Sequence, residues 1–554
     1  MMHNMARKNR SDRAVRNAPA ADTVENFMGG ISYKWNALDT LKMVTASSVF
    51  GEPAYYRDGA FRDMTITDGL MRIDPVFAEY VVSCIRTFDG VPTSKVMEEA
   101  IDAALDCDFR AALEWAVTLR RDYYMRLNPQ VIMVRAALHP KRRAFDEECP
   151  GLFGEIEKAV MARADEPASQ LTYYLYRRGS KARIPSVLKR AWARRIGEMS
   201  RYEMYKYRTA GVGLIDTVRI CHAKGVLVDE LMRTGTIAVE DSEKTWETMR
   251  TGGASWAQIL DTIRIGHMAL LRNLRGIFSE IDDMDRAREI LGELRAGVPG
   301  GKQFPFRYYS AYMTVGKASG INHKQMILDA LEECMDISCA NLPRLKGRTM
   351  CLSDNSGSAW GAFTSEYGTV TVADIDNLSS VIAARNSDEG VVGKFGDRLI
   401  RTDISKRNGV LTQARKLSGS RSADVGGATE CGIWLFFDEA IRKKEVFDHI
   451  FIYSDMQAGH GGLYGTPAEQ QRYMNAGFGC RGSYIDAARL IDVYRRTVNP
   501  KVNVFSVQTA GYNNVVIPEN GYRTALLYGW TGKELIYADA MDRFWDEKDA
   551  ENGL

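Results

Sequence analysis

The chain has 554 residues, 45% of them hydrophobic and 26% charged, so it is long enough for two or more domains with sizeable cores. Its net charge of +2 excludes a protein that is polycationic over its whole surface. No stretch holds the roughly 18 apolar residues of a membrane span, and the nine cysteines form no C-x-x-C motif, so we expect no membrane partner, reduced thiols and a cytoplasmic location.

The N-terminus is polar and rich in arginine. Five basic residues lie between positions 7 and 16, and no apolar segment of the kind found in signal peptides accompanies them. We therefore predict a flexible basic tail over residues 1–30.

Helical periodicity dominates residues 31–343. Residues 97–106, 109–120 and 323–334 carry apolar side chains at three- and four-residue spacing, and short polar links separate such segments. This pattern is typical of stacked helix pairs, although no strict repeat period is visible. We therefore predict an α-helical repeat array.

One part of the helical region is strongly basic. Residues 177–224 contain thirteen Lys or Arg and three acids, a local balance of +10. Tyr202, Tyr205 and Tyr207 alternate with cations in this segment. Clustered cations with aromatic neighbours favour a surface that binds nucleic-acid phosphates. The alternative is a solvated helix face whose cations form ion pairs with acids elsewhere in the fold.

Residues 344–554 change to an alternation of strands and helices. Strand patterns are found at 349–353, 391–395, 398–401, 447–453, 501–507 and 524–528, and helical patterns at 433–437 and 484–494. Alternation of this kind predicts a doubly wound α/β sheet of the Rossmann-like type.

An oxygen-rich motif follows the first of these strands, where open α/β sheets bind ligands. It has the form D-x-S-x-S, and a threonine and a second aspartate follow at later strand and helix edges. The five residues are Asp354, Ser356, Ser358, Thr429 and Asp455. Their oxygens suit a hard cation such as Mg²⁺, and the set resembles the metal-ion-dependent adhesion site of von Willebrand A domains. The alternative is an Asp/Ser turn that caps the next helix.

Such a site would bind rather than react. Its ion would keep an open position for a carboxylate or phosphate from outside. No general base, two-metal arrangement or zinc cluster is visible in the sequence, so we do not expect an enzyme.

Several short segments together resemble the Ro ribonucleoprotein family, of a bacterial or phage type. They are residues 50–56, 206–208, 213, 219–224, 269–274, 305–312 and 427–431, in this order. Members of the family join a TROVE module (named for telomerase, Ro and vault proteins) to a von Willebrand A domain. The resemblance spans about residues 40–545.

The resemblance implies a monomeric ring of HEAT-like helical repeats whose ends are joined by the A domain. Y-like small noncoding RNA would bind outside the ring, and single-stranded 3′ ends of misfolded RNA would enter the hole, in RNA quality control or decay. An exoribonuclease is a further implied partner. The predicted RNA-binding residues are Lys189, Arg190, Arg194, Lys206, Arg208 and His222 toward the outer face, and Arg272 toward the interior.

A different class of function stays open. The chain could be a metal-dependent protein-interaction module whose helical repeats bind a peptide and not RNA. His222 and Arg272 also have ordinary structural interpretations, as a satisfied histidine and as a polar edge of a buried helix. One departure from the family is the glycine-rich loop 456–483, which is long and could cover the metal site.

Overall fold

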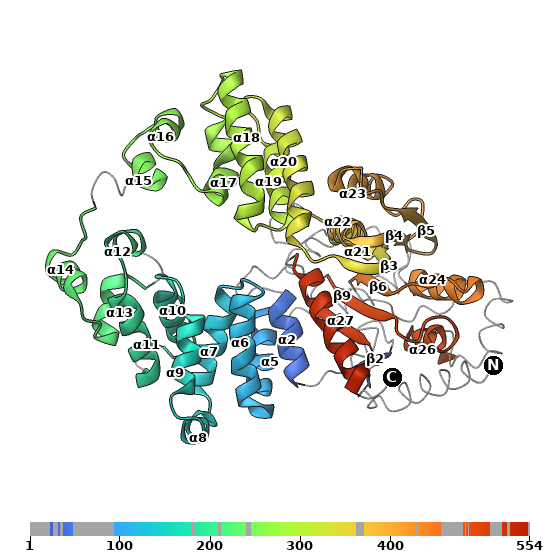
Figure 1. Ribbon diagram of the computed structural model, residues 1–554, viewed down its shortest axis with the longest axis horizontal. Coiled ribbons are helices and arrows are strands. Elements are labelled where there is room, and N and C mark those ends of the chain that lie inside the picture. The colour runs from blue at the N-terminus through green and yellow to red at the C-terminus, as the bar shows by residue number, and fades with distance from the viewer. Residues whose placement is uncertain are drawn as a thin grey trace, which may run out of the picture. The chain divides into compact units, whose positions relative to one another are not determined.

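The computed structural model describes fourteen segments of the chain (Figure 1). They are residues 23–25, 31–33, 37–47, 93–179, 183–208, 212–239, 245–361, 370–427, 430–455, 480–481, 484–485, 487–509, 523–528 and 532–551. Residues 1–22 of the predicted tail, the segment 50–56, Thr429 and most of the loop 456–483 lie outside them.

Two compact units divide the chain. The first, here called the helical unit, comprises Asn36–Phe50 and Thr93–Ile265. The second, here called the α/β unit, comprises Met1–Trp35, Gly51–Pro92 and Gly266–Leu554.

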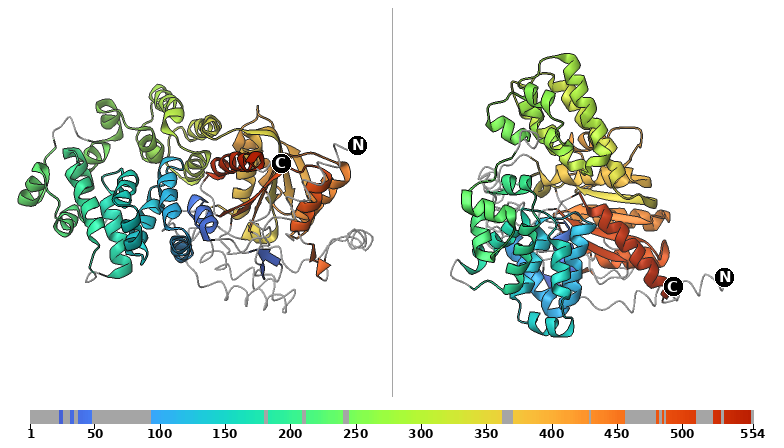
Figure 2. Two further views of the ribbon diagram at one scale, coloured as in Figure 1. Left: turned by 60° about the horizontal axis from the view of Figure 1, so that its bottom comes forward. Right: turned by 60° about the vertical axis from the view of Figure 1, so that its left-hand side comes forward.

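The helical unit is a succession of short helices that lie side by side (Figures 1 and 2). They are α2 (Ala37–Ser47), α5 (Thr93–Cys107), α6 (Phe109–Arg121), α7 (Leu127–Leu138), α8 (Arg142–Glu148), α9 (Leu152–Val160), α10 (Glu166–Arg178), α11 (Ser186–Gly197), α12 (Arg201–Tyr207), α13 (Leu214–Cys221), α14 (Val226–Thr234), α15 (Trp246–Thr251) and α16 (Trp256–Thr262). Packing is mostly between helices close in sequence, as for α6 with α7 and α11 with α13. This packing confirms the predicted helical repeat array.

Helix α6 shows how the sequence forms these elements. The Asp108 side chain caps its first turn by accepting from the Ala111 N–H at 2.9 Å. Its buried residues, Phe109, Ala112, Leu113, Ala116 and Leu119, recur at one-, three- and four-residue steps and form one apolar face.

Three buried polar side chains tie helices α7, α10 and α11 together. The Gln170 amide donates to Gln130 Oε1 at 2.7 Å, and Trp192 Nε1 donates to Gln170 Oε1 at 2.8 Å. Gln130 in turn donates to the Val160 carbonyl at the end of α9, at 3.2 Å. Because buried polar groups are costly without partners, this chain of bonds fixes how the four helices pack.

The α/β unit contains a six-stranded sheet, as predicted. Its strands are β3 (Leu345–Asp354), β4 (Ser387–Phe395), β5 (Leu399–Asp403), β6 (His449–Ser454), β9 (Asn503–Gln508) and β10 (Thr524–Tyr528). The order is β10-β9-β6-β3-β4-β5, with every neighbouring pair parallel except β4 and β5. The chain order therefore reverses between β3 and β6, the place where doubly wound sheets bind ligands.

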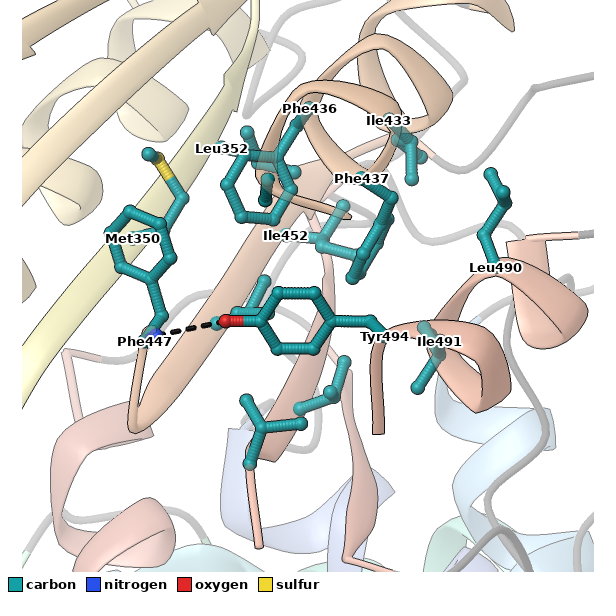
Figure 3. Packing of buried hydrophobic residues seen from close by; sticks show 14 of the residues in the cluster. Met350, Leu352, Ile433, Phe436, Phe437, Phe447, Ile452, Leu490, Ile491 and Tyr494 are labelled. Atoms are coloured by element: carbon teal, nitrogen blue, oxygen red, sulfur yellow. Dashed lines mark hydrogen bonds between the residues drawn. The ribbon is translucent and has the colours of Figure 1, made fainter. Parts of the chain in front are cut away.

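Helices cover both faces of the sheet. On one face, α22 (Val372–Arg385) contacts β3, β4 and β6. On the other face, α24 (Glu430–Lys443) packs against α26 (Ala487–Thr497), and both contribute to one buried cluster with Met350 and Leu352 of β3 (Figure 3). The carboxyl-terminal half of β3 is buried throughout, which explains its continuous apolar run.

The α/β unit also includes four helices that precede the sheet in the sequence. They are α17 (His267–Ile277), α18 (Met284–Gly301), α19 (Pro305–Lys317) and α20 (Lys324–Ser338). Two carboxylates of α20 hold the first turn of α23 (Val410–Ser418). Asp336 accepts from the Val410 N–H at 2.9 Å, and Glu332 from the Thr412 N–H at 3.2 Å. The compact units thus divide at residue 265, whereas the sequence pattern changes at 343.

The remaining elements are short or terminal. They are β1 (Thr23–Glu25), β2 (Ile31–Tyr33), η2 (Cys339–Asn341), α21 (Gly357–Gly361), β7 (Cys480–Arg481), β8 (Tyr484–Ile485) and α27 (Glu534–Glu551). Strand β1 lies within the predicted tail, and β8 occupies the first residues of the predicted helix 484–494. None of the described helices combines the length and apolarity needed to cross a bilayer.

Tyr494 provides a test of the α/β core. Its hydroxyl donates to the Glu445 carbonyl at 2.7 Å and accepts from the Phe447 N–H at 2.8 Å (Figure 3). Tyr494→Phe would leave that buried N–H without a partner, so we expect a loss of about 1–3 kcal/mol in the free energy of unfolding. Urea denaturation measures it. Tyr176→Phe, at a ring that is 71% exposed, is the control and should change nothing; equal effects of both variants contradict the prediction.

Candidate functional site

Two of the predicted metal ligands meet at the reversal of the sheet. Asp354 ends β3 and Asp455 directly follows β6, and both are 0% exposed. The Ser454 hydroxyl donates to Asp354 Oδ2 at 2.6 Å, and the Ser356 N–H donates to Asp354 Oδ1 at 2.9 Å. The topology therefore brings together two carboxylates that are far apart in the sequence.

The electrostatics of this edge favour a cation. Burial, and after it the charge of Asp455, raises the pKa of Asp354 to about 7, against hydrogen bonds from Ser454 and Ser356. A third carboxyl group, Asp376 of α22, is also 0% exposed. Its pKa is raised well above the ordinary value by burial and then by the charges of Asp354 and Asp455. Asp376 was not among the predicted ligands, because no motif spacing marks it.

The hydroxyl part of the predicted site is partly visible. Ser356 is buried, and its Oγ lies 3.1 Å from Oγ of the more exposed Ser358. The Gly357 N–H donates to the Gly427 carbonyl at 2.9 Å, which holds the D-x-S-x-S loop against the segment that leads to Thr429. Thr429 itself lies outside the described residues.

A buried amide pair supports the loop from below. Asn355 Nδ2 donates to Asn377 Oδ1 at 2.9 Å, and Asn377 Nδ2 donates to Asn355 Oδ1 at 3.1 Å. The Asn355 N–H also donates to the Phe395 carbonyl of β4 at 2.9 Å. The loop is therefore fixed to the sheet and to α22 before any ligand binds.

These donors fit a hard divalent cation. Two buried carboxylates and two hydroxyls supply the oxygen ligands that Mg²⁺ prefers, and the ion would offset the repulsion between the carboxylates. In the parts of the chain that the structure describes, no three His, Cys, Asp or Glu side chains are grouped to hold a metal. The hydroxyls would therefore have to complete the ligand set, and the metal stays a prediction.

The described cations of the basic segment 177–224 fall into two groups, those that form an ion pair with an acid and those that do not. The first group pairs with acids: Arg177 with Glu98, Arg195 with Glu203, Arg201 with Glu230, Lys206 with Glu247 and Arg219 with Asp216. The second group makes no ion pair with a described residue: Arg178, Arg183, Lys189, Arg190, Arg194, Arg208 and Lys224. The cations of the second group therefore have no carboxylate bound to them in an ion pair, although Arg194 lies near enough to Glu157 to lower its pKa.

Helix α11 carries three of the predicted RNA-binding residues, on different sides. Arg190 and Arg194 line a hollow of about 400 Å³ that also includes Arg142 and Glu157. Lys189 lies toward α13, where its charge opposes the effect of burial on the pKa of Cys221.

Helix α12 presents cations on aromatic rings. The Arg208 guanidinium lies 4.3 Å from the centroid of the Tyr205 ring, and Lys206 Nζ lies 5.6 Å from that of Tyr202. Lys206 also pairs with Glu247 of α15, where Trp246 stacks on Trp256 with ring centroids 5.6 Å apart. The tryptophans were not among the predicted residues.

The other two predicted RNA-binding residues lie elsewhere. His222 is exposed and ends α13 in the left-handed conformation, with φ at 58°. Arg272 is exposed on α17 and belongs to the α/β unit. Within the helical unit the structure therefore brings Arg190 together with Arg194 in one hollow, while Lys206 and Arg208 lie on different tyrosine rings. Their role in RNA binding stays a prediction.

Comparison with known proteins supports the architecture. No family model and no curated protein matches the sequence. Among solved structures, the chain is similar to the crystal structure of the Deinococcus radiodurans Ro (RSR) protein, with a TM-score of 0.55 and 14% sequence identity. The match covers 80% of this chain and 93% of that one. The chain therefore has a Ro-like fold, in which a helical array is joined to a von Willebrand A-like α/β domain.

Metal binding can be tested by thermal stability. We expect Mg²⁺ to raise the melting temperature of the wild type, with a stabilisation of about 2.7 kcal/mol at a hundred times the Kd. Asp354→Asn should abolish the response, because it removes a buried ligand. Asp403→Asn, the same change at an exposed position of β5, should preserve it. A melting temperature that neither Mg²⁺ nor a chelator alters contradicts the prediction.

Glu157 makes stability depend on pH. Burial raises its pKa from 4.5 to about 7, while Gln170 and Arg194 act in the opposite direction. The folded protein thus holds this proton more tightly than the unfolded chain, and its stability falls as the pH rises from about 4.5 to about 7. We expect Glu157→Gln to exceed the wild type in free energy of unfolding by about 3 kcal/mol at pH 8 and by little at pH 4.5. Urea titrations at both values measure this, and a pH-independent difference contradicts it.

Proposed function

We propose that the chain is a noncatalytic RNA-binding scaffold. It would bind a Y-like small noncoding RNA on its basic helical surface and single-stranded 3′ ends of misfolded RNA, in RNA quality control or decay. The observation that carries the proposal is a group of cations on and around α11 that form no ion pair with a described residue, among them Lys189, Arg190 and Arg194. They lie on a chain whose fold is Ro-like.

Physical chemistry gives this group a polyanionic partner. An arginine without a carboxylate partner retains its donors, and its planar fork matches a phosphate. Cations spaced along a helical surface gain free energy from the counterions that RNA releases on binding. The half-buried tyrosines of α12 and Trp246 of α15 add aromatic surfaces on which unpaired bases can stack.

The α/β unit would contribute a binding site and no chemistry. With Mg²⁺ held by Asp354, Ser356, Ser358, Thr429 and Asp455, it would offer an open position to a carboxylate or phosphate of a partner. An exoribonuclease is a candidate for that partner. Closure of the helical array into a monomeric ring, and a cytoplasmic location, belong to the same proposal.

One observation favours a second function. Arg177, Arg195 and Arg201 form ion pairs with Glu98, Glu203 and Glu230, so these cations of the basic segment stabilise the fold. A metal-dependent protein-interaction module would need no more than this. Nucleic acid that copurifies with the protein and disappears on nuclease treatment separates the two functions.

Salt dependence tests the RNA-binding surface. In Lys189→Gln/Arg190→Gln/Arg194→Gln, we expect weaker binding of single-stranded RNA and a slope of log K against log salt that is shallower by about 2, at about 0.7 for each lost phosphate contact. Fluorescence anisotropy at several salt concentrations gives both values.

A matched control removes the same charge elsewhere. Lys406, Arg407 and Lys416 are exposed cations of the α/β unit, and their triple change to Gln should leave the salt slope unchanged. If both triple variants lower the slope equally, net charge and not this surface determines RNA binding. If neither does, the surface is not used.

A further inference from the structure

The hollow formed by α8, α9 and α11 has the features of a ligand site. Its volume of about 400 Å³ lies within the range of small-molecule pockets, roughly 300–1,000 Å³. Three guanidinium groups line it, from Arg142, Arg190 and Arg194. Arg142 pairs with Asp146 at 2.7 Å, whereas Arg190 and Arg194 make no ion pair with any residue that the structure describes.

The first turn of α9 forms another part of the wall. This nine-residue helix begins after Gly151, which has φ at 85° and provides no side-chain cap. Gly151 and Gly154 both line the hollow, and a Cβ added at either would meet no atom within 4 Å. The hollow thus reaches the first turn of the helix, whose positive end attracts an anion, although the N–H groups of Leu152 and Gly154 already donate to backbone carbonyls. With three arginines alongside, a phosphate is the anion of choice.

Glu157 closes the hollow on its inner side. It is 0% exposed and belongs to the lining, and neither of its carboxyl oxygens has a hydrogen-bond partner within normal distance and angle among the described residues, although Gln170 and Arg194 are near enough to lower its pKa. A buried carboxyl without donors is costly, and the cost is relieved when a ligand supplies them. This carboxyl group can therefore accept hydrogen bonds from a ligand, six residues along α9 from Gly151.

A single ligand can satisfy both ends. Gly151 and Glu157 are six residues apart, about 9 Å along a helix axis, a separation that a nucleoside monophosphate can bridge from phosphate to base edge. A carboxylate has two acceptor oxygens side by side. Guanine matches them with two adjacent donors, N1–H and the N2 amino group, whereas adenine, cytosine and uracil each place a donor next to an acceptor.

We propose that this hollow binds one guanine nucleotide, with its phosphate on the arginines and the first turn of α9 and its base edge on Glu157. As a residue of an RNA strand, the guanine would give the scaffold a preference for a base, and this form rests on the proposed RNA-binding function. Free GMP presents the same chemistry and does not depend on that function.

The test compares matched ligands at pH 8, above the pKa of Glu157. The probes are a ten-nucleotide oligouridine, the same strand with one central guanosine, GMP and AMP. The wild type should prefer the guanosine strand to oligouridine, and GMP to AMP, by about tenfold, the value of one bidentate base contact. Glu157→Gln should reduce both preferences below twofold, because the amide replaces one acceptor with a donor.

Two further variants guard the interpretation. Glu155→Gln makes the same chemical change at an exposed position of α9 and should retain the preference. Gly154→Leu fills the hollow where an added Cβ meets no atom and should abolish the preference without a change in charge. A preference that survives both Glu157→Gln and Gly154→Leu overturns the pocket.

The outcomes separate this proposal from the proposed function. Salt-dependent binding of oligouridine without any preference for guanine, in strand or mononucleotide, overturns the pocket and leaves the RNA scaffold standing. Failure of every strand to bind overturns the scaffold, and GMP against AMP then decides the pocket alone. A preference for GMP without one for the guanosine strand assigns the hollow to the free nucleotide.

Discussion

A charged side chain that is buried away from water needs a partner of opposite charge, or it changes its protonation state and becomes neutral. This constraint separates the charged residues of the chain into those that stabilise the fold and those that can bind a ligand. Arg195, only 9% exposed, satisfies it through Glu203 at 2.8 Å, and Lys394, 2% exposed, through Asp424 at 2.8 Å. These pairs serve the fold. Asp354 and Asp376 are buried and form no ion pair with a described residue, and burial together with the charge of Asp455 raises their pKa values. Where the fold leaves a charge uncompensated, a ligand can provide the missing partner.

The architecture was predictable because it depends on patterns that repeat over many residues. Alternating apolar segments predicted β4, β5 and β10 within a few residues, and helical spacing predicted α5, α6 and α20. Even the convergence of Asp354 and Asp455 could be foreseen, since parallel strands place their carboxyl ends at one edge. The short strand β8, in place of the start of a helix at residue 484, could not, because two residues carry no period.

The composition of the sites was less predictable, because it depends on which side chains meet across the fold. The charge count of residues 177–224 treated Arg195 and Arg190 alike, yet one is buried against Glu203 and the other lines an open hollow. Asp376 and Glu157 lie in helix interiors without a motif, and only burial distinguishes them. Likewise, local sequence places α20 with the earlier helices, whereas its contacts through Asp336 and Glu332 place it with the sheet.

Affinity and selectivity would have separate physical origins on the helical unit. Lys189, Arg190 and Arg194 would interact with phosphates, which every RNA carries, so their contribution would fall with salt and be the same for all sequences. Glu157 would contact the base edge and carries no positive charge, so its contribution would not depend on counterion release and would differ between bases. Arg190 and Arg194 line the hollow and also belong to the basic surface. A strand held there by its phosphates would therefore present its bases to the Glu157 carboxyl group one after another. Non-specific attraction of the phosphates would then bring a guanine to the hollow. The start of α9, which has no side-chain cap, would fix where on the surface the guanine is bound.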